Sequence, residues 1–268
     1  MADEHPDIPD DRLRLIFTCC PGELAPENRV ALTLLSVIYR IFSEGYSSHG
    51  GPSLTRVDLC HQAIRLGTVL VELMPEHSEA LGLLALMEVQ VSRNRARVAP
   101  SGELVQMADQ DRALWDRSLI ASGLDHLERA ALLGTCGAYQ LQARIAACHA
   151  VASSFDATDW RRIAALYTEL RRTSSSPIVE LNRAIAVCMA DGPDAALKII
   201  DTLDNEPALK SYHRLPATRA DFLWRLQPWS EAATEYRRAL RLVSNDRERD
   251  FLTKRLKDCE STEYDRFA

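Results

Sequence analysis

The fold is decided by the stretch 194–203, which reads Asp194-Ala195-Ala196-Leu197-Lys198-Ile199-Ile200-Asp201-Thr202-Leu203. Two similar stretches flank it, Trp160-Arg161-Arg162-Ile163-Ala164-Ala165-Leu166-Tyr167-Thr168-Glu169-Leu170 and Glu231-Ala232-Ala233-Thr234-Glu235-Tyr236-Arg237-Arg238-Ala239-Leu240. In each stretch, apolar residues recur at the spacing of one face of a helix. Leu203 follows Leu170 by 33 positions, and Leu240 follows Leu203 by 37. The sequence therefore predicts a helix that recurs at a nearly constant interval.

A partner helix is expected before the second and the third copy, at 179–190 and at 216–226. The two intervals bracket the tetratricopeptide period of about 34 residues. Small residues would let the paired helices approach closely, namely Ala186 with Ala195 and Ala220 with Ala232. Because one pair cannot bury its apolar face alone, successive pairs stack. Residues 152–268 are thus predicted to form tetratricopeptide-like antiparallel helix pairs that end in a charged helix at 246–259.

The preceding residues also have helical periodicity. Helices are expected at 27–43, 56–74 and 78–93, with Ser78 as the N-cap of the third, and at 139–151. A further helix is expected at 109–133, with a break near Asp116. The predicted fold class is all-α, with a helical bundle at 37–151 followed by the tetratricopeptide-like repeats.

Composition favours a globular protein that does not bind DNA directly. Of 268 residues, 46% are hydrophobic, and the net charge is −6. Nucleic-acid binders usually carry a basic stripe or a high pI. There are two local basic runs, Arg93, Arg95 and Arg97 in the first and Arg237, Arg238 and Arg241 in the second. We interpret them as a solvated loop and a solvated helix face.

The seven cysteines form no CxxC pair, and most lie in apolar stretches that are predicted to be helical. They are typical of small buried hydrophobic residues in a reducing cytosol. The first residues are acidic and lack the apolar core of a signal peptide. No apolar run reaches the roughly 18 residues that a membrane span needs. A cytoplasmic location and no membrane association are expected.

Catalytic and metal-binding patterns are not evident. The sequence contains no GxSxG, no HExxH and no phosphate-cradling glycine loop, so we expect no enzymatic activity, no catalytic residues and no cofactor. The nearest metal-like grouping is Cys148 and His149 with His126. The acidic residues of 109–116 lack the spacing and the glycine of an EF-hand. No metal site is predicted.

Several polar residues lie within otherwise apolar stretches of sequence. They form the candidate interaction groove: Glu44, Tyr46, Gln110, Arg112, Trp115, Tyr139, Gln140 and Gln142. Buried polar groups must find partners. One interpretation is a hydrogen-bonded network that ties the helix layers together. The other is a groove that accepts a peptide, another protein region or a small molecule, since aromatic and arginine residues are typical of binding hot spots.

Several ordered motifs resemble one subgroup of bacterial extracytoplasmic-function (ECF) sigma factors, which carries a long C-terminal extension. The stretch Ile8-Pro9-Asp10-Asp11-Arg12-Leu13-Arg14-Leu15-Ile16-Phe17-Thr18-Cys19-Cys20 is similar to the start of sigma region 4. Later landmarks are similar to the extension, among them Phe42-Ser43-Glu44-Gly45-Tyr46, Glu79-Ala80-Leu81-Gly82-Leu83-Leu84-Ala85-Leu86-Met87 and Ser176-Pro177-Ile178-Val179-Glu180-Leu181-Asn182-Arg183-Ala184.

The resemblance implies three segments: 1–36 as a remnant of the start of sigma region 4, 37–151 as the helical bundle of the extension, and 152–268 as its repeats. Nothing in the sequence resembles sigma region 2 or the region 4 helix-turn-helix, and natural loss and deliberate removal stay open. The implied function is a regulatory module that controls transcription initiation through sigma regions 2 or 4 or RNA polymerase. The alternative is a ligand-sensing domain for a small molecule or peptide. The predicted helix at 13–20 could pack on the repeats or on a second copy, as a homodimer.

Overall fold

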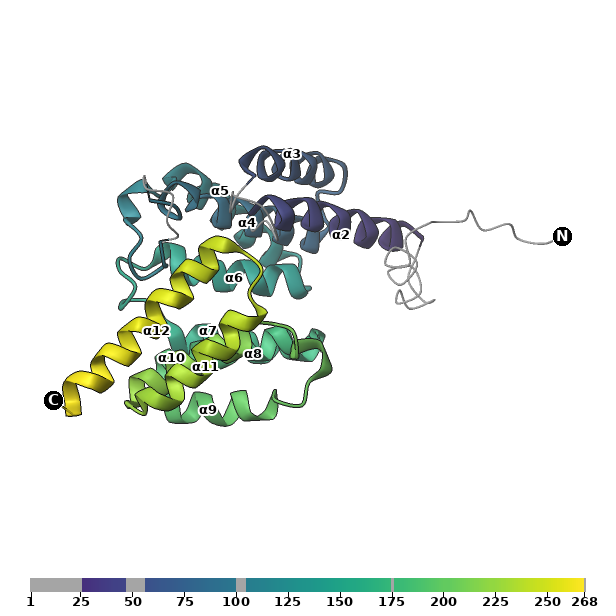
Figure 1. Cartoon of the computed structure of the whole chain (residues 1–268). Coiled ribbons are helices and arrows are strands. Elements are labelled where there is room, and N and C mark those ends of the chain that lie inside the picture. The colour runs from purple at the N-terminus through teal and green to yellow at the C-terminus, as the bar shows by residue number, and fades with distance from the viewer. Residues whose placement is uncertain (1–25, 47–55, 100–104, 175, 268) are drawn as a thin grey trace.

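The computed structural model describes residues 26–46, 56–99, 105–174 and 176–267 (Figure 1). In these ranges the architecture is all-helical, which confirms the predicted fold class. The predicted helix at 13–20 and most of the segment 1–36 lie outside the described residues.

The N-terminal half is a bundle built around one buried helix. Its helices are α2 (Pro26–Tyr46), α3 (Val57–Leu73), α4 (Ser78–Val91), α5 (Arg117–Leu132) and α6 (Ala138–Val151). Two short 3-10 turns, η1 (Asn94–Ala96) and η2 (Arg112–Leu114), lie between α4 and α5. Helix α4 is buried over nearly its whole length and contacts α2, α3, α5 and α6. A helix that is apolar all round is suited to this central place.

The C-terminal half consists of helices that pack mainly on their neighbours in the chain. They are α7 (Trp160–Thr173), α8 (Pro177–Asp191), α9 (Pro193–Thr202), α10 (Arg214–Leu226), α11 (Trp229–Leu242) and α12 (Asp246–Phe267), with η3 (Pro207–Leu209) between α9 and α10. This arrangement confirms the predicted repeat-like helix pairs. The last helix extends beyond the predicted end at 259.

Two tight turns connect the helix pairs. Gly192 has a φ of 96°, in a region that favours glycine, and Pro193 supplies the first residue of α9. Gln227, between α10 and α11, also has a positive φ, of 76°. These short connections fix neighbouring helices antiparallel.

Two helix starts differ from the prediction because side chains cap different residues. His77, not Ser78, is the N-cap of α4: its ring accepts from the amide of Ala80 at 3.2 Å. The helix predicted at 109–133 does break near Asp116, as expected, but the prediction of helix before the break is wrong. Asp111 accepts from the amide of Ala113, and Asp116 caps α5, so a 3-10 turn replaces the first helical turns. Aspartates that bond their own downstream amides favour turns over helix.

The prediction that buried alanines let paired helices pack closely holds for one of the two helix pairs. Ala220 and Ala232 are completely buried in the cluster that joins α10, α11 and α12. Between α8 and α9 the buried alanines are Ala184 and Ala196, whereas Ala186 packs in the cluster of α6 and α7. A shift of one or two positions rotates a side chain to another helix face, since successive residues differ by about 100°.

Four of the described cysteines are buried, as predicted: Cys60, Cys148, Cys188 and Cys259. Cys136 is exposed, because it lies in the turn between α5 and α6, so the buried interpretation is wrong for this residue. Cys19 and Cys20 lie outside the described residues.

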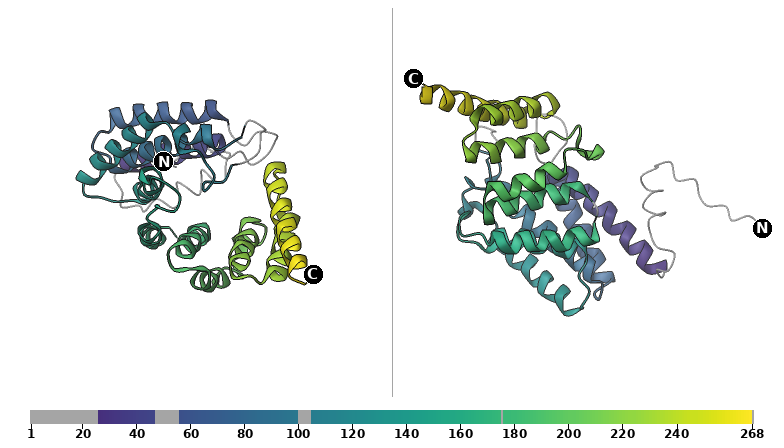
Figure 2. Two further views of the ribbon diagram at one scale, coloured as in Figure 1. Left: turned by 90° about the vertical axis from the view of Figure 1, so that its left-hand side faces the viewer. Right: turned by 90° about the horizontal axis from the view of Figure 1, so that it is seen from below.

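The helices follow one another around an arc, and α12 closes it on the side that faces the N-terminal bundle (Figure 2). One hydrophobic cluster contains Leu141 and Ile145 of α6 together with Ile163 and Leu166 of α7. Packing therefore continues across position 151, and the domain boundary predicted there stays a prediction. None of the helices in the described ranges combines the length and the apolar character that a membrane crossing requires.

Candidate functional site

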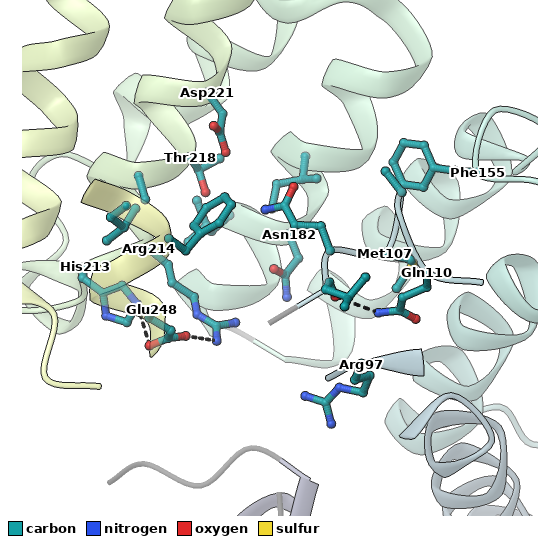
Figure 3. A pocket seen from close by; sticks show the side chains of 18 of the residues that line it. Arg97, Met107, Gln110, Phe155, Asn182, His213, Arg214, Thr218, Asp221 and Glu248 are labelled. Atoms are coloured by element: carbon teal, nitrogen blue, oxygen red, sulfur yellow. Dashed lines mark hydrogen bonds and ion pairs between the residues drawn. The ribbon is translucent and has the colours of Figure 1, made fainter. Parts of the chain in front are cut away.

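A cavity of about 500 Å³ lies on the inner side of the arc (Figure 3). Its walls come from the end of α2, the turn at 93–97, the segment 105–110 and helices α8, α10 and α12. Helices remote in sequence meet here because the arc curves. The volume falls within the range of about 300–1,000 Å³ that small-molecule sites occupy.

Three further hollows of about 520–600 Å³ adjoin this cavity. One shares Arg93, Met107 and Asn182 with it, another shares Arg97 and Glu248, and the third shares Gln106. The shared walls make the concave side a continuous groove. Such a surface suits an extended partner, as in other helical-repeat proteins.

Tyr46 joins the end of α2 to the turn after α4. Arg93 Nη2 donates to the Tyr46 hydroxyl at 2.5 Å, and Arg97 Nη1 donates to the Tyr46 carbonyl at 2.6 Å. The Arg97 guanidinium also lies 3.8 Å from the centre of the Tyr46 ring, a cation–π contact. Burial lowers the pKa of Arg97, and the positive charges of Arg93 and Arg214 lower it further. The prediction of a solvated loop is right for Arg95, which is exposed. It is wrong for Arg93 and Arg97, which are partly buried by their contacts with Tyr46.

Trp115 fixes the segment before α5. It is 2% exposed, and two guanidinium groups contact its ring, Arg112 at 4.5 Å and Arg93 at 5.7 Å from the ring centre. Arg112 Nη1 also donates to the carbonyls of His149, at 2.7 Å, and Ala152, at 2.9 Å. These contacts tie the segment to the end of α6, so the wall at 105–110 has a rigid support.

Several buried polar atoms around this support have no hydrogen-bond partner among the described residues: Gln110 Oε1, Arg112 Nη2, Trp115 Nε1, His149 Nδ1 and Trp160 Nε1. Burial lowers the pKa of His149 to about 4, and the charges of Arg93 and Arg112 act in the same direction. The imidazole is therefore neutral at physiological pH. Unsatisfied buried polar atoms are rare in proteins, and bound water or a ligand can satisfy them.

Glu248, from the first turn of α12, links α12 to the start of α10. Its carboxylate accepts from Arg214 Nη2 at 2.8 Å and lies 3.2 Å from His213 Nε2. The hydrogen bond from His213 and the adjacent Arg214 lower the pKa of Glu248 to about 2. This cluster forms the wall of the cavity opposite Arg97 (Figure 3).

The eight predicted groove residues divide between wall and scaffold. Tyr46 and Gln110 line the cavity, and Gln142 lines an adjoining hollow. Arg112 and Trp115 support the wall, as described above, and Glu44 is half-buried near the end of α2. Three of the eight residues thus line the concave side, and their role in binding stays a prediction.

The remaining two, Tyr139 and Gln140, belong to the scaffold interpretation. Gln140 is completely buried and donates from its side-chain amide to the Thr135 carbonyl at 2.6 Å. The backbone amide of Tyr139 donates to Glu79 at 2.8 Å, and its ring packs edge-on against Tyr39. Both residues hold α6 against the bundle.

The polar wall residues that the sequence did not single out for a site include Arg97, Asn182, His213, Arg214 and Glu248. Arg97 belongs to a basic run that we interpreted as solvated, and the others lie in helical sequence without a motif that indicates a site. Only the curvature of the helix array brings them together. No local sequence signal identifies such a site.

The metal-like grouping separates in the structure. His126 contacts Glu88 at 2.8 Å, whereas the His149 ring packs edge-on against Trp160. Within the described ranges no three His, Cys, Asp or Glu side chains gather in a way that could hold a metal ion.

Residues 31–131 match a model described as "Family of unknown function (DUF6596)". An uncharacterized protein of Rhizobium meliloti (strain 1021) is 41% identical over 221 residues, which are 82% of this chain and 52% of the relative. The chain therefore spans about half the length of this relative. No solved structure matches the chain.

Proposed function

We propose that this chain is a non-enzymatic regulatory and protein-interaction module of an ECF-type sigma factor. In this proposal the groove contacts sigma regions 2 or 4 or RNA polymerase and thereby controls transcription initiation. The ordered motifs that resemble the sigma-factor extension motivate the partner. The continuous concave groove supports the mode of binding, because helical-repeat arrays bind through such surfaces.

The chemistry of the groove fits a protein partner. Arg93, Arg97 and Tyr46 converge on one cavity, and arginine and tyrosine are enriched in binding hot spots. Apolar side chains of α8 and α12 line the same space. A partner segment with acidic and apolar residues would match both parts.

A pull-down of the chain against RNA polymerase, and against separately expressed sigma regions 2 and 4, tests the proposal. We expect specific capture of at least one of them. Arg97→Glu should abolish capture, whereas Arg241→Glu, on the exposed surface of α11, should not. Clean failure with a chain that is folded by circular dichroism would remove this function.

A second candidate is a ligand-sensing domain, favoured by the unpartnered buried polar atoms beside the cavity. A small molecule that binds the folded state raises the melting temperature by mass action. A thermal-shift screen across metabolite classes would reveal such a ligand. The absence of stabilisation in every class would count against sensing.

A further inference from the structure

Two guanidinium groups from distant parts of the fold line the same cavity. Arg97 follows α4 and Arg214 begins α10, and they come from different walls of the cavity (Figure 3). Arg93 lines the same cavity. Burial lowers the pKa of Arg97, and the like charges of Arg93 and Arg214 lower it further.

The carboxylates on the cavity wall do not neutralise Arg93 or Arg97. Glu248 pairs with Arg214, and Asp221 already pairs with Arg255 at 3.0 Å. In the described part of the chain, neither Arg93 nor Arg97 has a carboxylate within 4.0 Å. The hydrogen bonds of Arg93 and Arg97 go to Tyr46, which carries no negative charge, so a bound anion would supply the counter-charge that these partly buried guanidinium groups lack.

The rest of the cavity is amphipathic. Leu181 and Ile185 of α8 and Phe251 of α12 supply apolar surface beside the arginines. An occupant can therefore place a charged group near the arginines and an apolar body along α8 and α12.

We propose that this cavity binds a small organic anion, with a carboxylate or phosphate group between Arg97 and Arg214 and an apolar body against Leu181, Ile185 and Phe251. Guanidinium groups donate paired hydrogen bonds to such oxyanions. The proposal deepens the ligand-sensing candidate and rests on it, but it does not depend on contact with a sigma region or polymerase.

Glu248 acts as an internal competitor in this arrangement. Its carboxylate occupies one side of Arg214 and holds the first turn of α12. An anion that binds Arg214 must share it with Glu248. Removal of the Glu248 charge should therefore strengthen anion binding rather than weaken it.

Isothermal titration calorimetry on the full chain tests the proposal with four probes. Benzoate and phenyl phosphate carry the two head groups on an apolar ring, inorganic phosphate is the head group alone, and benzamide is the neutral control. We expect saturable 1:1 binding of benzoate or phenyl phosphate, at least tenfold tighter than benzamide. The probe that binds identifies the head group.

Variants decide whether the arginines are responsible. Arg97→Gln and Arg214→Gln should each weaken binding at least tenfold, and Glu248→Gln should strengthen it severalfold. Arg241→Gln, on the exposed face of α11, should leave affinity unchanged. Circular dichroism verifies that each variant is folded, and the half-exposed Arg214 gives a second test if the Arg97 variant does not fold.

Three results would overturn the proposal: no saturable binding of either ring-bearing anion, equal affinity for benzamide, or affinity that both arginine variants retain. If neutral metabolites stabilise the chain while these anions do not bind, ligand sensing stands and the anion site fails. Capture of a sigma region is measured separately and bears on neither result.

Discussion

Replacement of Gly82 by alanine should destabilise the protein, because α4 and α6 cross in close contact at this glycine. A Cβ at position 82 would lie 2.7 Å from Cγ of Gln140 and 2.8 Å from its backbone nitrogen. Real Cβ atoms do not approach other atoms this closely, so α6 would have to move. The contact includes backbone, which cannot rotate away as a side chain can.

The expected magnitude combines two opposing effects. Overpacking a close contact costs about 1–3 kcal/mol. Alanine in place of glycine within a helix returns about 1 kcal/mol. The net loss for Gly82→Ala is therefore up to about 2 kcal/mol, which lowers the melting temperature by up to roughly 8 °C in a domain near this size.

Gly67→Ala provides the matched control, since Gly67 is also buried inside a helix. The nearest atom to its added Cβ is the terminal methyl carbon of Met87, at 2.8 Å, on a flexible side chain that can move. The helix propensity should dominate here, with a change between zero and about 1 kcal/mol of stabilisation. Thermal and urea unfolding followed by circular dichroism would compare the two variants. If Gly82→Ala is as stable as Gly67→Ala, the close α4–α6 contact is not what limits this position.

Three further predictions concern charges and phenols. The pKa of Glu248 is about 2 in the folded state, against an ordinary value of 4.5. The ionised Glu248 carboxylate therefore stabilises the folded state fully above pH 4.5, and this contribution is lost as the pH falls toward 2. In urea unfolding, the difference in free energy of unfolding between wild type and Glu248→Gln should shrink between pH 4.5 and pH 2. Arg112→Met should cost about 2–3 kcal/mol in the same assay, because it leaves two carbonyls without a donor, whereas exposed Arg95→Met should change stability by under about 0.5 kcal/mol. Burial raises the pKa of Tyr139 and of Tyr167 to about 12, so phenolate absorbance near pH 11 should be lower in the native chain than in urea, and each Tyr→Phe variant should narrow the difference.

Helix periodicity predicted most of the fold because local packing determines it. The apolar spacing of 194–203 and its flanking copies gave helices α7, α9 and α11 within a few residues. Errors arose where side chains compete with the backbone. Asp111 and Asp116 bond amides just downstream, and this local choice replaced helix by turn before α5.

The candidate site was less predictable because its walls come from segments that are far apart in the sequence. Tyr46 and Gln110 could be predicted because each is a polar residue in an apolar stretch, and a buried polar group needs a hydrogen-bond partner. Arg214 and Glu248 carry no such signal, because they lie in helices rich in charged residues, and charged side chains in such helices are usually exposed to solvent. Their pairing across 34 positions depends on how α10 and α12 are placed by the intervening repeat.

Glu248 separates a structural explanation of the arginines from a binding one. If Arg214 served only to hold α12, Glu248→Gln would lower stability and leave any anion affinity unchanged or weaker. If the arginines form an anion site, the same substitution still removes the ion pair at 2.8 Å and lowers stability, but it frees a guanidinium for the ligand and raises affinity. Opposite changes in stability and affinity in one variant are therefore expected only if Arg214 is shared between the fold and a bound anion.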